Sequence, residues 1–129
     1  MVLPTEGTFA LKNVGSGKTV SFDGSDPWYP KVGEECTELR YQPDPDGVWG
    51  VLAPTTDDRV FDFFRSSQSV GLWGKHSGAN QRWRMEEEFI VSKSGDKAMF
   101  QKKDGQIGIK NPSCDDEGQQ WEVLESCNQ

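Results

Sequence analysis

Residues 74–83 of this 129-residue chain read GKHSGANQRW, and they place the only histidine, an asparagine, two glycines and a tryptophan within ten positions. The imidazole of His76 can donate or accept a hydrogen bond, and the amide of Asn80 can do both at once. The two glycines allow the sharp turn that such a loop needs. The segment could hold a polar ligand, or it could be a tight turn that leads to a core tryptophan at Trp83.

The overall charge limits which partners the chain can have. The net charge is -7 and the pI is near 4.7, so we do not expect nucleic acid or an anionic membrane surface, because both bind a basic face. No apolar run approaches the ~20 residues of a membrane span, and we expect no membrane insertion. Residues 1–20 show no signal peptide, which leaves the localisation open between release from the cell and the cytoplasm.

The cysteines favour no metal site. Cys36, Cys114 and Cys127 lie far apart without a C-x-x-C spacing, and the chain has one histidine. A zinc site is therefore not expected, and no cofactor fingerprint is present. One disulfide with a free thiol and three reduced thiols are both compatible with this spacing.

Short apolar segments separated by glycine and proline indicate an all-β chain. Two series of residues recur along the chain with a period near 40, which is typical of a repeat architecture. The segments are 8–13, 18–23, 59–64, 89–94 and 106–110; the first series is Phe22–Asp23, Phe61–Asp62 and Phe100–Gln101, and the second is Trp49, Trp83 and Trp121. The sequence therefore predicts three units around a shared core, with extra residues in the first-unit loop 24–35.

Two of these units carry a recognisable signature. Gln81–Trp83 and Gln119–Trp121 match the Q-x-W motif of the ricin B-chain-like, or R-type, lectin repeat, and Asp46–Trp49 keeps the tryptophan without the glutamine. The chain resembles single-domain galactoside-binding members of that family over nearly its whole length. The resemblance implies a β-trefoil with three pseudo-symmetric lobes of about 40 residues. One domain would span 1–129, with lobes at about 5–50, 51–87 and 88–127.

In R-type lectins each lobe can form a shallow sugar site from an aspartate, an aromatic ring and polar residues before Q-x-W. The resemblance assigns these roles to Asp62, Trp73, His76 and Asn80, with Lys75 at the rim. One carboxylate can accept from two adjacent hydroxyls of galactose, and an indole can cover its apolar face. The implied partners are galactose- or N-acetylgalactosamine-terminated glycans of glycoproteins or glycolipids, bound without catalysis, cofactor or metal.

The other two lobes match this pattern less well. In the first lobe, Asp23 stands in the aspartate place, Tyr41 or Arg40 in the ring place and Asp46 in the asparagine place, so this lobe could also bind a sugar. In the third lobe, Gln101 replaces the aspartate and Gly118 the asparagine. We expect the third site to be degenerate.

The first-lobe loop leaves several alternatives open. Trp28 and Tyr29 lie between two prolines, and they could pack as a lid, contact a second copy in a homodimer, or touch an extended glycan. A β-trefoil protease inhibitor that uses the 24–35 loop is the alternative function. An enzyme is disfavoured, because no nucleophile motif accompanies His76.

Overall fold

The computed structural model describes residues 2–128, which form twelve short strands in three lobes of four. The first lobe holds β1 (Ala10–Asn13), β2 (Thr19–Ser21), β3 (Lys31–Gly33) and β4 (Leu39–Pro43). The second holds β5 (Gly50–Pro54), β6 (Val60–Phe64), β7 (Ser69–Trp73), the 3-10 turn η1 (Ala79–Gln81) and β8 (Trp83–Glu86). The third holds β9 (Phe89–Ser92), β10 (Ala98–Gln101), β11 (Ile107–Lys110), η2 (Glu117–Gln119) and β12 (Trp121–Leu124). Neither turn, nor any other helix in the described part, is long and apolar enough to cross a membrane.

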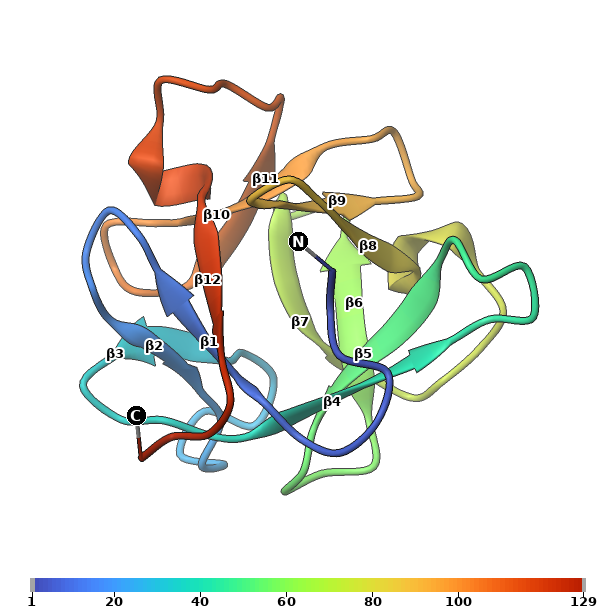
Figure 1. Cartoon of the computed structure of the whole chain (residues 1–129), viewed down its shortest axis with the longest axis horizontal. Coiled ribbons are helices and arrows are strands. Elements are labelled where there is room, and N and C mark those ends of the chain that lie inside the picture. The colour runs from blue at the N-terminus through green and yellow to red at the C-terminus, as the bar shows by residue number, and fades with distance from the viewer. Residues whose placement is uncertain (1, 129) are drawn as a thin grey trace.

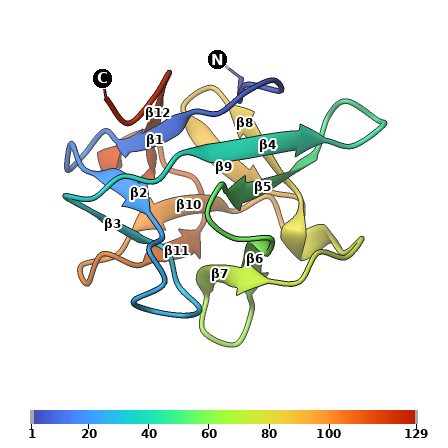
Figure 2. The ribbon, with the colours of Figure 1, turned by 90° about the horizontal axis from the view of Figure 1, so that it is seen from below.

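Six strands pair into a closed barrel, and three further strand pairs form hairpins. The hairpins lie on one side of the barrel (Figures 1 and 2). The barrel pairs β4 with β5, β8 with β9 and β12 with β1, so the end of each lobe joins the start of the next. Within the lobes, a bridge joins Phe9 to Leu39, Gly50 pairs with Trp83, and Trp121 N donates to the Glu88 carbonyl. The hairpins are β2–β3, β6–β7 and β10–β11. Closure satisfies the backbone groups that an open sheet edge would expose.

The core residues repeat with the lobes. Trp83 and Trp121 begin β8 and β12, and each is at most 1% exposed. Each indole N–H donates to a carbonyl 22 residues earlier, that of Phe61 at 3.1 Å and that of Met99 at 3.2 Å. Leu39 begins β4 and is fully buried in the corresponding place of the first lobe. Leu39, and not Trp49, is therefore the counterpart of the two core tryptophans.

Trp49 lies in the loop between β4 and β5. Its ring is half-buried, and the Arg84 guanidinium lies 4.5 Å from the ring centroid. The prediction that Trp49 belongs to the repeated core is wrong, because the loop places it after β4 and not at the start of that strand.

The pairing of the hairpin strands also corrects the alignment of the lobes. Three buried pairs correspond across the hairpins: Val20 with Val32, Phe61 with Leu72, and Met99 with Ile109. The residue after the first member of each pair is Ser21, Asp62 or Phe100. The counterparts of Asp62 are thus Ser21 and Phe100, whereas Asp23 and Gln101 were predicted. The difference arises in the first lobe because β2 ends at Ser21, so that Asp23 already belongs to the following loop.

The loop between β2 and β3 is the longest of the three hairpin loops. It spans 22–30, whereas the other two span 65–68 and 102–106, so the predicted extra residues of the first lobe are found here. The loop lies beside the β6–β7 hairpin in Figures 1 and 2, and the Trp28 carbonyl accepts a 2.7 Å hydrogen bond from Leu72 N. A loop of the first lobe is therefore part of the surroundings of β7.

One disulfide links the β3–β4 connection of the first lobe to the C-terminal segment. Cys36, just before β4, pairs with Cys127 near the C-terminus, with Cα atoms 5.7 Å apart. Cys114 is free and exposed. Of the two cysteine states that the sequence left open, the structure has one disulfide and a free thiol.

Candidate functional site

Asp62 lies in the middle of β6 and forms the centre of the candidate site. Its side chain is 5% exposed, and both carboxylate oxygens are held by amides. Asn80 Nδ2 donates to Oδ1 and Gln81 Nε2 donates to Oδ2, each at 2.8 Å. A buried carboxylate is stable only with such partners. A carboxylate offers about four lone-pair sites, so each oxygen can still accept from a ligand that reaches it.

Gln81 joins this carboxylate to the preceding loop. Its Nε2 also donates to the Gly74 carbonyl at 2.8 Å, and its Oε1 accepts from His76 N at 2.8 Å. Gln81 thus bonds to two backbone groups of the loop and to the Asp62 carboxylate. The Q-x-W motif marks the glutamine in the second and third lobes alike, and only the pairing register shows that Asp62 faces it.

His76 is oriented by a backbone hydrogen bond. Its Nδ1 accepts from Gly78 N at 2.8 Å, so the proton of the neutral ring lies on Nε2. Nε2 is 3.7 Å from Asp62 Oδ2, which is longer than a hydrogen bond and leaves this N–H for a ligand oxygen. A Cβ on Gly78 would lie 2.5 Å from the His76 ring and 2.7 Å from Asn80 Oδ1. Glycine is therefore required for the two side chains to approach each other.

Trp73 supplies the apolar wall of an open cavity. It ends β7, is 51% exposed, and meets the Phe64 ring edge-on with centroids 6.2 Å apart. The cavity measures about 440 Å³, and the residues that line it are Asp62, Phe63, Phe64, Arg65, Ser66, Trp73, His76 and Asn80. An apolar wall with a few convergent polar groups is typical of a small-ligand site.

Lys75 does not belong to this group. Its Nζ bonds to Oε1 of Gln42 on β4 at 3.2 Å, and it does not line the cavity. Of the five side chains predicted for the second lobe, the structure brings together Asp62, Trp73, His76 and Asn80, while Lys75 points to the first lobe.

The three residues predicted for the first lobe do not meet. Tyr41 lies on the inner face of β4, and its hydroxyl donates to the Trp83 carbonyl at 2.8 Å. Burial, together with the charges of Asp44 and Asp46, raises the pKa of Tyr41 to about 12. The prediction of Tyr41 as an exposed ring is wrong, since strand alternation turns it into the core. The residue in the place of Trp73 is Gly33, the partner of Thr19.

The two first-lobe aspartates stabilise separate loops. Asp23 accepts from Ser25 N in the β2–β3 loop, and Asp46 accepts from the N–H groups of Val48 and Trp49 in the β4–β5 loop. These hydrogen bonds lower the pKa of both carboxyls. Each aspartate acts within its own turn, as aspartates commonly do.

The third lobe has a different set of side chains in the same places. Phe100 stands in the place of Asp62 and Lys110 in that of Trp73. Lys110 Nζ lies 4.4 Å from the Phe100 ring centroid and 2.8 Å from Asp116 Oδ2, and this bond lowers the pKa of Asp116. The lobe has no carboxylate or indole in the corresponding places.

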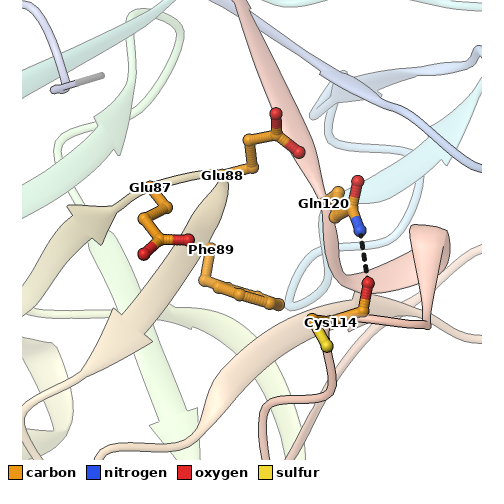
Figure 3. Close-up of a pocket in the computed structure, with 5 residues that line it drawn as sticks. All are labelled: Glu87, Glu88, Phe89, Cys114 and Gln120. Carbon is orange, nitrogen blue, oxygen red and sulfur yellow. Dashed lines mark hydrogen bonds between the residues drawn. The ribbon is translucent and has the colours of Figure 1, made fainter.

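A second cavity, of about 460 Å³, lies between the third lobe and the β8–β9 turn (Figure 3). Glu87, Glu88 and Phe89 line one side, and Cys114 and Gln120 line the other, where Gln120 Nε2 donates to the Cys114 carbonyl at 3.2 Å. This second cavity has no indole among its lining residues, so it lacks the pairing of an indole with a hydrogen-bonded carboxylate that Trp73 and Asp62 provide in the second lobe. Within residues 2–128, no cluster of three or more His, Cys, Asp or Glu side chains could hold a metal ion.

Comparison with known proteins identifies the fold. No family model and no curated protein matches the chain. The C-half of the earthworm R-type lectin, solved in complex with GalNAc, superimposes with a TM-score of 0.65 and 16% identity, over 92% of this chain and 98% of that one. The designed threefold-symmetric protein ThreeFoil gives a TM-score of 0.72 and 18% identity over 92% and 99%. The chain is a β-trefoil. Its architecture resembles the ricin B-type lectin domains, and the predicted all-β fold is confirmed.

The same β-trefoil occurs inside larger proteins. An endo-β-galactosidase from Clostridium perfringens that releases GlcNAcα1-4Gal superimposes with a TM-score of 0.78 and 10% identity. The match covers 92% of this β-trefoil and 32% of that enzyme, so the chain spans about a third of the enzyme's length. At such identities the likeness concerns the fold alone.

Proposed function

We propose that this β-trefoil binds the terminal galactose or N-acetylgalactosamine of glycans in the second-lobe cavity and leaves the glycan unaltered. The observation that carries the proposal is the Asp62 carboxylate, which two amides hold beside the half-exposed indole of Trp73. The earthworm R-type lectin C-half, which shares the fold, was solved with GalNAc, and this supports the same class of sugar.

The chemistry of galactose fits these groups. Its axial 4-hydroxyl lies beside its equatorial 3-hydroxyl, so both can donate to one carboxylate, and charge-assisted hydrogen bonds of this kind are strong. The opposite, apolar face of the sugar can then cover the Trp73 ring. Asn80 and the Nε2–H of His76 would donate to the hydroxyl oxygens, which leaves few polar groups of the sugar unpaired.

The same cavity offers little for catalysis. Among its lining residues Asp62 is the only carboxylate, and glycoside hydrolases generally use a pair of them, one on each side of the scissile bond. The unprotonated nitrogen of the neutral His76 ring, Nδ1, already accepts from Gly78 N, so it is not free to activate Ser66, the one serine among these lining residues. Binding without turnover is therefore the function that we infer.

The protease-inhibitor alternative gains no support from the loop that would carry it. Trp28 and Tyr29 pack against Trp73 and Phe64 of the second lobe, whereas an inhibitory loop presents its side chains to a protease.

A glycan array with sugar competition tests the proposed function. The protein should bind galactose- and N-acetylgalactosamine-terminated glycans, and free galactose should displace it. Free glucose, whose 4-hydroxyl is equatorial, should not. Equal displacement by the two sugars, or no binding to any galactose-terminated glycan, would rule out the assignment.

A further inference from the structure

Two exposed tryptophans form a continuous aromatic surface at the edge of the second-lobe cavity. Trp28 is 47% exposed and Trp73 is 51% exposed. Their ring centroids are 5.8 Å apart and the planes are tilted by 30°, a separation within the range typical of aromatic pairs. In this pair each side chain still keeps about half of its surface open to solvent.

Trp28 is held in this exposed position by its own loop. Asp26 Oδ1 accepts from the N–H groups of Trp28 at 3.0 Å and Tyr29 at 3.2 Å, and the Trp28 carbonyl accepts from Leu72 N at 2.7 Å. The Tyr29 ring meets Phe64 edge-on with centroids 5.8 Å apart. The loop is thus anchored on both sides of Trp28. A ligand would order little of the protein when it binds there, and such preorganisation favours affinity.

A fixed cation supports the same ring. The guanidinium of Arg59 lies 5.6 Å from the centroid of the Trp28 ring, within the range of a cation–π contact. Asp57 fixes that guanidinium through two hydrogen bonds, at 3.0 Å from Nε and 2.8 Å from Nη2. Trp28 is therefore a positioned surface ring and not a loose loop residue.

We propose that Trp28 binds the second sugar of a glycan whose terminal sugar occupies the second-lobe cavity. This inference rests on the proposed function. Trp28 does not line the second-lobe cavity but contacts Trp73 at its edge, so a second sugar joined to one that covers Trp73 can reach the Trp28 ring. A pyranose with an apolar face can stack on Trp28 there. The ligand class is thus a galactosyl or N-acetylgalactosaminyl disaccharide, or a longer chain.

A comparison of the three hairpin loops supports this role for Trp28. The β2–β3 loop carries Trp28, and the shorter loops 65–68 and 102–106 of the other hairpins contain no aromatic residue. In the first lobe, Ser21 and Gly33 stand in the places of Asp62 and Trp73. Its long loop instead completes the surface of the neighbouring lobe.

Calorimetric titration with mono- and disaccharides tests the inference. The ligands are methyl β-galactoside and galactosyl disaccharides with 1-3, 1-4 and 1-6 linkages. The parent protein should bind at least one disaccharide roughly three- to tenfold more tightly than the monosaccharide, the gain expected for one added aromatic contact. Trp28→Ala should abolish that gain and leave the affinity for methyl β-galactoside within about twofold. Trp28→Phe should keep part of the gain.

Two controls keep the outcomes distinct. Val14→Ala removes another exposed apolar side chain, in the β1–β2 loop, and should change neither affinity. Trp28→Leu keeps apolar packing without a flat ring. If the melting temperature of Trp28→Ala falls, Trp28→Leu replaces it, and it should likewise lose the disaccharide gain and keep the affinity for methyl β-galactoside.

Two results would overturn the inference. One is a parent protein that gains nothing from any linkage. The other is an equal loss for monosaccharide and disaccharide in the Trp28 variants, which would mean that Trp28 only supports Trp73. A parent protein that binds no galactoside at all would instead refute the proposed function.

Discussion

The side-chain amide of Gln81 donates to both Asp62 Oδ2 and the Gly74 carbonyl, each at 2.8 Å. One residue of the repeated turn thereby fixes the carboxylate of the candidate site. Gln119 makes the same turn in the third lobe, where its Oε1 accepts from Ser113 N and its Nε2 donates to the Asn111 carbonyl. It has no carboxylate to hold, because Phe100 stands in the place of Asp62.

This relationship gives a matched pair of substitutions. Gln81→Met and Gln119→Met should each lower the free energy of unfolding by about 1–3 kcal/mol, because each leaves buried backbone groups unpaired. Only Gln81→Met should also weaken galactoside binding, by roughly tenfold or more, because Asp62 loses a donor that positions it. Chemical denaturation and calorimetric titration measure the two effects. Equal affinities in the two variants would contradict the role given to Gln81.

Asp62→Asn should weaken galactoside binding by roughly 10- to 100-fold, which corresponds to the loss of charge-assisted hydrogen bonds worth about 1.5–3 kcal/mol. The substitution keeps the shape of the side chain, but its NH2 group replaces one oxygen that accepts from Asn80 or Gln81, so a thermal unfolding curve must accompany the affinity. The control is Asp23→Asn, which removes an exposed carboxylate in the β2–β3 loop. If the two variants bind galactosides equally well, Asp62 is not the acceptor that we propose.

The buried Tyr41 predicts a loss of stability at high pH. Its pKa in the folded protein is about 12, above the ordinary value of 10, because burial disfavours the ionised form. Below pH 10 the tyrosine is neutral in both the folded and the unfolded chain, and the free energy of unfolding is unaffected by it. As the pH rises from 10 to 12, the unfolded chain loses this proton first, which lowers the free energy of unfolding by about 2 kcal/mol at pH 11.5.

Tyr41→Phe removes this group and tests the prediction. Denaturant unfolding at pH 9 and pH 11.5 should show a smaller decrease in stability for the variant than for the parent. Parallel decreases in the two proteins would show that Tyr41 does not titrate in this range.

The disulfide should stabilise the fold without acting on the candidate site. Cys36 and Cys127 are separated by 91 residues, and closing a loop of that length stabilises the folded state by roughly 4–5 kcal/mol in the chain-entropy model. Replacing both cysteines with alanine should lower the melting temperature strongly but leave the galactoside affinity of the folded protein within about twofold. Cys114→Ser, at an exposed free thiol, should change neither. Loss of sugar binding in the folded double variant would contradict the separation of the two roles.

The sequence allowed the second and third lobes to be predicted better than the first. Q-x-W appears twice because Trp83 and Trp121 fill the same core place, and Gln81 and Gln119 make the same turn. In the first lobe Leu39 fills that core place, and no tryptophan marks it. The periodicity therefore pointed to Trp49, a loop residue, and the assignments of Tyr41 and Asp46 followed from it.

Local patterns also could not show which contacts form between lobes. A Phe-Asp pair occurs at both Phe22 and Phe61, but only Asp62 lies within a strand, and only it faces the η1 turn. Lys75 lies next to His76 in the sequence, yet it extends to Gln42 of the first lobe. The packing of Trp28 on Trp73 is likewise a contact between lobes, and it depends on the length and anchoring of the β2–β3 loop.

The asymmetry of the three lobes has a consequence for agglutination. Asp62 and Trp73 have the counterparts Ser21 and Gly33 in the first lobe, and Phe100 and Lys110 in the third. With the proposed sugar site in the second lobe alone, a single chain would attach to one cell and could not cross-link two. Any cross-linking of red cells by the purified protein would therefore report self-association, such as the homodimer that the sequence left open, and would vanish on dilution below the dissociation constant of that assembly.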